Sequence, residues 1–213
     1  MVDNTAVEAG FSEDKENKGG KEILKEGPFK FDDWFSEVYE PSREMTENVL
    51  MKYRRLAVVD LTEYSIVRIY SSGVPAEKSK MYTLSGIYPD AKFGFVLQKN
   101  GAPIASIWFD VLENRVLVIK QIQGKRGCRE ALAGFRWERM LVRFVVEWTG
   151  LHNFKEVRVI RGEHQEWHRN IPERKKKFYL IYDVSAKREG FKPVLGKGIE
   201  YYSFIFGGNE KRK

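Results

Sequence analysis

The chain has 213 residues, of which 42% are hydrophobic, and this is enough for one domain with a buried core. Its longest apolar runs, such as LAVVDL, are far shorter than the roughly 18–20 residues that span a membrane, and its single cysteine excludes an intramolecular disulfide. The net charge of +7 favours an anionic partner, which leaves nucleic acid, anionic lipid and a phosphate-bearing cofactor open.

Residues 1–27 carry seven acids and four lysines and almost no periodic apolar residues. We expect a disordered acidic leader here. The leader lacks the basic and apolar regions of a signal peptide, so we expect a cytoplasmic protein. The remaining residues, 28–213, are predicted to form a single domain with a strongly basic balance.

The part from 28 to 91 is predicted to be mainly helical. Aromatic residues at 29–35 are expected to anchor it to the body. Apolar residues recur at helical spacing from 45 to 57, and Ser42 is placed to cap the start of that helix. The stretch 64–91 is ambiguous and is compatible with a strand near 66–70 followed by an irregular loop.

The part from 92 to 206 is predicted to form the core. Three β-rich runs at 92–98, 103–111 and 115–123 are joined by the turn signals Asn100-Gly101 and Glu113-Asn114, which indicates an antiparallel meander. Apolar spacing then predicts one long helix over 128–150, followed by a strand at 154–160 that pairs in parallel with the third run. A basic helix near 172–190 and a strand at 201–206 complete an α+β fold, a mixed sheet with helices on its faces.

The third run ends in QIQGKRG, directly before the long helix. Gly124 and Gly127 permit a tight turn, and the free amides at a helix N-terminus, together with Lys125 and Arg126, are suited to bind a phosphate. The loop matches neither the dinucleotide-binding fingerprint nor the P-loop. The alternative is an ordinary turn with two solvated cations.

The succession of meander, glycine-bearing loop, long helix, parallel strand and second helix resembles the acyl-CoA N-acyltransferase (GNAT) fold. In that superfamily the loop is written Q/R-x-x-G-x-G/A and binds the pyrophosphate of CoA. Gln121 and Gly124 match this motif, whereas Gly127 comes one residue late. The superfamily's second helix typically ends in Tyr-x-x-x-Gly-Phe; here the Gly-Phe pair is present, but Ala186 stands in place of the tyrosine.

Residues 92–206 also resemble the VirK family of bacterial proteins, which are linked to virulence and envelope stress and have no settled biochemical activity. Members share a strand ending in Gln-Gly, a His-containing loop, an Arg-rich stretch and a Tyr-Asp pair. The matching residues are Gln123, Gly124, His164, Arg174, Lys175, Tyr182 and Asp183.

The GNAT resemblance implies an acyl-CoA cofactor and an amine acceptor that attacks the thioester directly. Glu163 or His164 is then the predicted base and Tyr182 the predicted proton donor, one helical turn before the superfamily's tyrosine. The strands are expected to part around Ile122 and Val157 to admit the pantetheine arm. The predicted cofactor-binding residues are Gln123, Gly124, Lys125, Arg126, Gly127, Cys128 and Arg129.

Three other interpretations stay open. His164 and His168 are four residues apart and could share a zinc ion, but the sequence has no evident third ligand and we expect no metal. The basic run at 174–177 with nearby aromatic residues is compatible with a non-catalytic module that binds nucleic acid or anionic lipid. Cys128 is expected to fill the first turn of the helix rather than to act as a nucleophile.

Overall fold

The computed structural model describes residues 29, 32–71, 86–165, 174–196 and 198–207. Within them the core is a seven-stranded sheet in the order β1-β2-β3-β4-β5-β7-β6. Among the described strands only β4 and β5 pair in parallel. The predicted fold class, an antiparallel meander with one parallel pair, is confirmed. The strands are β1 (Tyr64–Tyr70), β2 (Phe93–Lys99), β3 (Ala102–Leu112), β4 (Val116–Gly124), β5 (Glu156–Ile160), β6 (Lys192–Gly196) and β7 (Ile199–Ile205).

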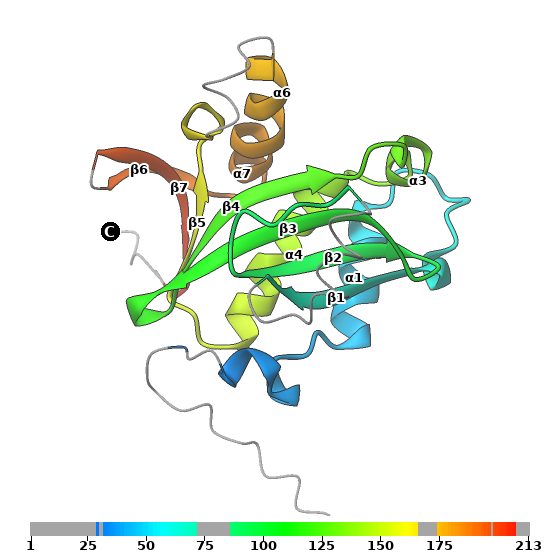
Figure 1. The fold of residues 1–213 in the computed structure, drawn as a ribbon, viewed down its shortest axis with the longest axis horizontal. Coiled ribbons are helices and arrows are strands. Elements are labelled where there is room, and N and C mark those ends of the chain that lie inside the picture. The colour runs from blue at the N-terminus through cyan, green and yellow to red at the C-terminus, as the bar shows by residue number, and fades with distance from the viewer. Residues whose placement is uncertain (1–28, 30–31, 72–85, 166–173, 197, 208–213) are drawn as a thin grey trace, which may run out of the picture.

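The helices lie on one face of the meander and at the end where β4 and β5 part (Figure 1). They are α1 (Arg43–Tyr53), α3 (Arg129–Ala133), α4 (Trp137–Leu151), α6 (Lys175–Phe178) and α7 (Ser185–Arg188). Short 3-10 turns are η1 (Asp32–Phe35), η2 (Glu37–Tyr39), η3 (Leu61–Glu63), η4 (Glu113–Arg115) and η5 (Gly162–His164). A π-helical turn, η7 (Tyr179–Val184), joins α6 to α7, so these three form one continuous C-terminal helix.

Several local predictions are confirmed. The Ser42 side chain accepts a hydrogen bond from the amide of Met45 (3.1 Å) and caps α1. Asn100 and Gly101 both have positive φ, as a two-residue hairpin turn requires. The strand suggested near 66–70 is β1, and it pairs with β2 at the edge of the meander. The predicted leader lies outside the described residues.

The prediction of one long helix over 128–150 is wrong, because the chain breaks between α3 and α4. The end of α1 and the residues just after it form hydrogen bonds with the chain at this break. The amide of Arg55 donates to the carbonyl of Gly134 (2.7 Å), and the amide of Arg136 donates to the carbonyl of Tyr53 (3.0 Å). Phe135, between these two bonds, is buried. The break therefore exchanges intrahelical hydrogen bonds for bonds to a distant segment and buries an aromatic ring.

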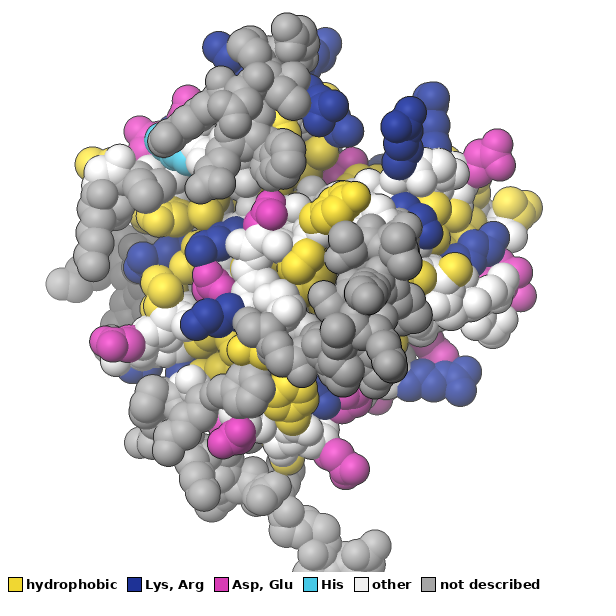
Figure 2. Space-filling view, viewed as in Figure 1, with side chains coloured by type: hydrophobic (Ala, Val, Ile, Leu, Met, Phe, Trp, Pro, Cys, Tyr) yellow, Lys and Arg dark blue, Asp and Glu magenta, His cyan; other side chains and the backbone are white. Residues whose placement is uncertain are grey.

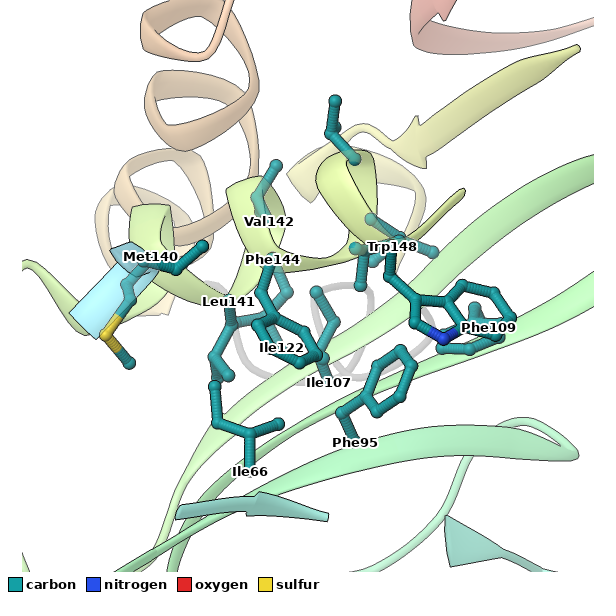
Figure 3. Close-up of a cluster of buried hydrophobic side chains, with 14 of the residues drawn as sticks. Ile66, Phe95, Ile107, Phe109, Ile122, Met140, Leu141, Val142, Phe144 and Trp148 are labelled. Carbon is teal, nitrogen blue, oxygen red and sulfur yellow. The ribbon is translucent and has the colours of Figure 1, made fainter. Parts of the chain in front are cut away.

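The main core lies between α4 and the meander. Figure 3 shows side chains of α4 pointing at the sheet, while Val142 points away from it, toward the C-terminal helix. Because α4 is covered on two sides, its apolar surface is wider than one face. The facing residues in Figure 3 are Leu141, Phe144 and Trp148 on α4 and Phe95, Ile107 and Phe109 on the sheet. The packing of α4 fixes the turn that precedes it.

Candidate functional site

A wide cleft opens where β4 ends and faces the C-terminal helix. Its volume is about 1290 Å³. Its walls come from the turn after β4, the beginning of α4 and one side of the C-terminal helix. Figure 2 shows Lys and Arg side chains beside α6 and beside the α3 turn, with a hollow between them. A concave basic surface of this kind raises the local concentration of anions.

The charge of the cleft is almost entirely positive. Glu138 is the one carboxylate among the described residues that line it. Arg139 is paired with Glu189 (2.8 Å), but none of the other cations of the cleft forms an ion pair with a described carboxylate. The lining cations are Arg55, Lys125, Arg126, Arg129, Arg136, Arg139, Arg174, Lys177 and Arg188.

The turn after β4 is only partly available to a ligand. The amide of Lys125 donates to the carbonyl of Ile104 (2.8 Å), and the amide of Cys128 donates to the carbonyl of Lys125 (3.2 Å). The amides of Arg126 and Gly127 donate to no described partner. Gly127 has φ +87°, a conformation that a side chain would strain. The protein thus uses the amides of Lys125 and Cys128, and those of Arg126 and Gly127 are left without a described acceptor.

The structure brings most of the predicted cofactor-binding residues together. Gln123, Arg129 and the residues 124–127 line the cleft, whereas Cys128 is half-buried and does not. The side chain of Gln123 is already engaged: its Oε1 accepts from the amide of Tyr88 (3.3 Å), and its Nε2 donates to the carbonyl of Gly86 (3.2 Å). Gln123 therefore holds the segment before β2 against β4.

β4 and β5 pair only as far as Ile119 opposite Val159. The next residue, Lys120, is extra in β4, because the register with β3 shifts there. A bulge bends the strand that carries it, and Figure 1 shows the two strands fanning apart beyond it. The strands therefore part along residues 120–122, which we call the β4 edge. The expectation that they part around Val157 is wrong, because Val157 is paired on both sides.

Two side chains occupy the β4 edge. The Nε2 of Gln165 donates to the carbonyl of Lys120 (2.8 Å). The hydroxyl of Tyr182 accepts from the amide of Ile122 (3.0 Å). Both side chains are buried, so these two backbone groups, which β5 leaves unpaired, are satisfied within the protein. The cleft reaches Ile122 from one side.

Tyr182 is carried by η7, which Asp183 anchors. The carboxylate of Asp183 accepts from the amide of Gly162 (2.8 Å) and from the hydroxyl of Tyr202 (3.1 Å). A Cβ at Gly162 would lie 2.8 Å from the backbone of Phe178, so only glycine fits beneath the helix. Burial raises the pKa of Tyr182, so its phenol keeps its proton at neutral pH.

Glu163 and His164 lie in η5, outside the lining of the cleft. Glu163 is paired with Arg161 (2.9 Å) and lines a second pocket of about 250 Å³ with Asp183. The Nε2 of His164 is buried and has no described hydrogen-bond partner. The structure therefore separates these two predicted bases from the turn after β4.

Glu138 is a cleft residue that the sequence did not single out. It lies in the first turn of α4. Burial raises its pKa, while its own amide, Lys177 and Arg55 act in the opposite direction. Its sequence context, a lone acid between Trp137 and Arg139 in an amphipathic helix, resembles any solvated helix start, so the pattern carried no signal.

Two further observations concern metal ions and membranes. Within the described residues, no group of three or more His, Cys, Asp or Glu side chains is arranged to hold a metal ion, and His168 lies outside them. No helix in the described ranges is both long and apolar enough to cross a membrane.

Comparisons with known proteins give matches at the level of structure alone. No protein-family model matches the sequence, and no curated protein sequence matches it, so the VirK resemblance is not shown. Similar solved structures include three acetyltransferases. The ribosomal-protein-S18-alanine N-acetyltransferase from Escherichia coli is 11% identical, with 70% of this chain and 98% of that chain covered and a TM-score of 0.41. A GNAT family acetyltransferase from Elizabethkingia anophelis with acetyl-CoA bound is 14% identical, with coverage of 67% and 98% and a TM-score of 0.34. A GNAT family N-acetyltransferase from Escherichia coli in complex with CoA is 12% identical, with 78% of each chain covered and a TM-score of 0.33. At this distance nothing about ligands or activity passes to this chain, whose function has to be inferred from its own site.

Proposed function

We propose that the protein is an acyl-CoA-dependent N-acyltransferase and that its cleft binds the phosphates of CoA. The observation that carries the proposal is the set of cleft cations without a described carboxylate partner, placed around the turn that ends β4. Guanidinium groups bind phosphate oxygens through paired, charge-assisted hydrogen bonds. The cleft, at about 1290 Å³, is somewhat larger than the roughly 300–1,000 Å³ of ordinary ligand pockets, which suits a long cofactor.

The β4 edge supplies a place for the pantetheine arm. The arm contains two amides, and the edge presents the carbonyl of Lys120 and the amide of Ile122 where β5 no longer pairs. An extended ligand can add to such an edge as a further strand does. Because the cleft extends to Ile122, the phosphates and the arm would lie along one continuous path.

The reaction would join the amine nitrogen to the thioester carbonyl carbon and then break the carbon–sulfur bond. The amide of Ile122 donates to Tyr182 in the free protein; released from that bond, it would stabilise the oxyanion that forms first. The departing thiolate takes a proton, and Tyr182 is the proposed donor. The phenol carries a proton at neutral pH, and the burial that raises its pKa would have to be relieved by the bound ligand before that proton is transferred.

The amine would approach from the other side of Tyr182. Ile181, which precedes Tyr182, lines the cleft, whereas Asp183, which follows it, lines the second pocket. Glu163 also lines that pocket and stays the predicted base that takes the proton from the amine, with His164 as its rival. Tyr182 would thus lie between the acyl donor and the acceptor.

Calorimetric titration with CoA and acetyl-CoA tests the proposal. We expect binding in the micromolar range that Gly124→Asp abolishes, because the new carboxylate repels phosphate and a Cβ there would lie 3.1 Å from Trp137. Ala102→Asp, at an exposed position at the start of β3 and outside the cleft, is the matched control. Turnover is measured as release of free CoA thiol with a panel of primary amines.

The same titrations, made with nucleic acid and lipid, test the alternative function, a non-catalytic basic module. A short oligonucleotide or an anionic vesicle that binds with steep salt dependence, together with silence toward CoA, would replace the enzyme with a basic binding module.

A further inference from the structure

The β4 edge is closed by the protein itself. The carbonyl of Lys120 accepts from Gln165, and the amide of Ile122 donates to Tyr182. These are the two backbone groups that an extended ligand arm would need. Only one set of partners can use them at a time, so the side chains and the arm compete for the same edge.

The element that carries Tyr182 has a second possible register. η7 is a π-helical turn, and such turns contain one more residue than an α-helical turn and are frequent at functional sites. A change in this turn would release the hydroxyl of Tyr182 from the amide of Ile122 and leave the phenol free to act as the proposed proton donor. The anchor that holds the present register is Asp183, through Gly162 and Tyr202.

We propose that Tyr182 and Gln165 form a built-in stop that keeps the β4 edge closed until the arm of the cofactor displaces them. This inference rests on the proposed function. The cleft admits the nucleotide part of CoA without any change at the edge, because neither Tyr182 nor Gln165 lines it. The nucleotide would bind first, and the arm would bind only when the edge opens.

Two ligands distinguish the cleft from the edge. Adenosine 3′,5′-bisphosphate has the nucleotide phosphates but no arm, whereas CoA has both. In Tyr182→Phe the amide of Ile122 has no acceptor until the arm provides one. We expect Tyr182→Phe and Gln165→Ala each to bind CoA about fivefold more tightly than the wild type, with unchanged affinity for the bisphosphate. Tyr182→Phe should at the same time lose most of its turnover, since it lacks the proton donor.

Tyr179→Phe is the matched control, because it makes the same substitution on the same helix at an exposed position. Its affinities should equal those of the wild type. Equal CoA affinity in the wild type and in both edge variants overturns the stop and leaves the proposed function standing. If the edge variants bind CoA and the bisphosphate more tightly by the same factor, the stop is also overturned, because the increase in affinity would then come from the cleft. Failure of every protein to bind CoA overturns the proposed function and this inference with it.

Discussion

His152 is a buried base whose ring centroid lies 4.7 Å from that of Tyr39 and 4.7 Å from that of Trp148. Only 7% of the residue is exposed. Burial lowers the pKa of His152 to about 4, and the positive charges of Arg68 and Arg115 act in the same direction. The folded protein therefore keeps this imidazole neutral, whereas the unfolded chain binds a proton near pH 6.5.

Stability should consequently fall as the pH drops from about 6.5 to about 4, because the unfolded state binds the proton more readily in that window. We expect His152 to contribute about 3 kcal/mol of this loss. His152→Phe keeps an aromatic ring but cannot titrate. Between pH 7 and pH 4 its free energy of unfolding should therefore fall by about 3 kcal/mol less than that of the wild type. Urea unfolding of both proteins at pH 7 and pH 4 measures the difference. Equal losses would show that His152 is not the group responsible.

Site residues were predictable where the chemistry is local. Gly124 and Gly127 could be assigned to the turn after a strand because strand, turn and helix follow one another in the chain, and both line the cleft. Glu163 and His164 are predicted from residue type alone; the turn after β5 places both outside the cleft, and Glu163 lines the second pocket. The contact of Tyr182 with Ile122 depends on the packing of the C-terminal helix against β4, which no local pattern encodes.

Whole helices and strands were likewise predictable where local patterns define them, and not where contacts with distant segments do. The meander, the cap at Ser42 and the parallel strand β5 follow from alternation, turn residues and the handedness of crossovers. The break between α3 and α4 does not, since its hydrogen bonds come from the segment after α1. β6 was also missed: it is a short edge strand with Pro193 near its start, and its pairing with β7 alone defines it.

Glu189 joins three helices at one point. It follows α7, and its carboxylate accepts from the hydroxyl of Tyr53 at the end of α1 and from Nε of Arg139 on α4 (2.8 Å). Its side chain is 4% exposed, and the Arg139 side chain is 22% exposed. The pKa of Tyr53 is raised, first by burial and then by Glu189. A buried carboxylate with two donors of this kind links the C-terminal helix to the rest of the core.

Glu189→Ala should lower the free energy of unfolding by about 3–5 kcal/mol, because it leaves a partly buried guanidinium and a buried hydroxyl without their acceptor. Glu47→Ala is the control, since Glu47 pairs with Arg43 at 2.6 Å on the surface, where ion pairs contribute little. Urea unfolding followed by far-UV circular dichroism gives both values. Similar changes in the two variants would mean that the junction at Glu189 is not an important link.

At the scale of the whole molecule, the net charge of +7 is less informative than its distribution. The cations on and just after β5 are neutralised, as in the pairs that Arg158 makes with Glu156 and Arg161 with Glu163. The described cations of the cleft are not, apart from Arg139. A surface that keeps like charges close together without counter-charges destabilises the free protein slightly and favours a bound anion.

Cofactor binding should therefore stabilise the protein, and the cleft cations should be responsible for it. CoA at about 100 times its Kd should add about 2.7 kcal/mol, or roughly 5–10 °C in Tm for a chain of this size. Arg129→Glu with Lys177→Glu should abolish this shift, because both residues line the cleft. Lys155→Glu with Lys192→Glu changes the net charge equally at exposed positions outside it, so its shift should match that of the wild type. Thermal unfolding with and without CoA, at low and high salt, measures all three proteins. If both double variants lose the shift alike, the attraction comes from the overall charge of the protein and the cleft does not select the ligand.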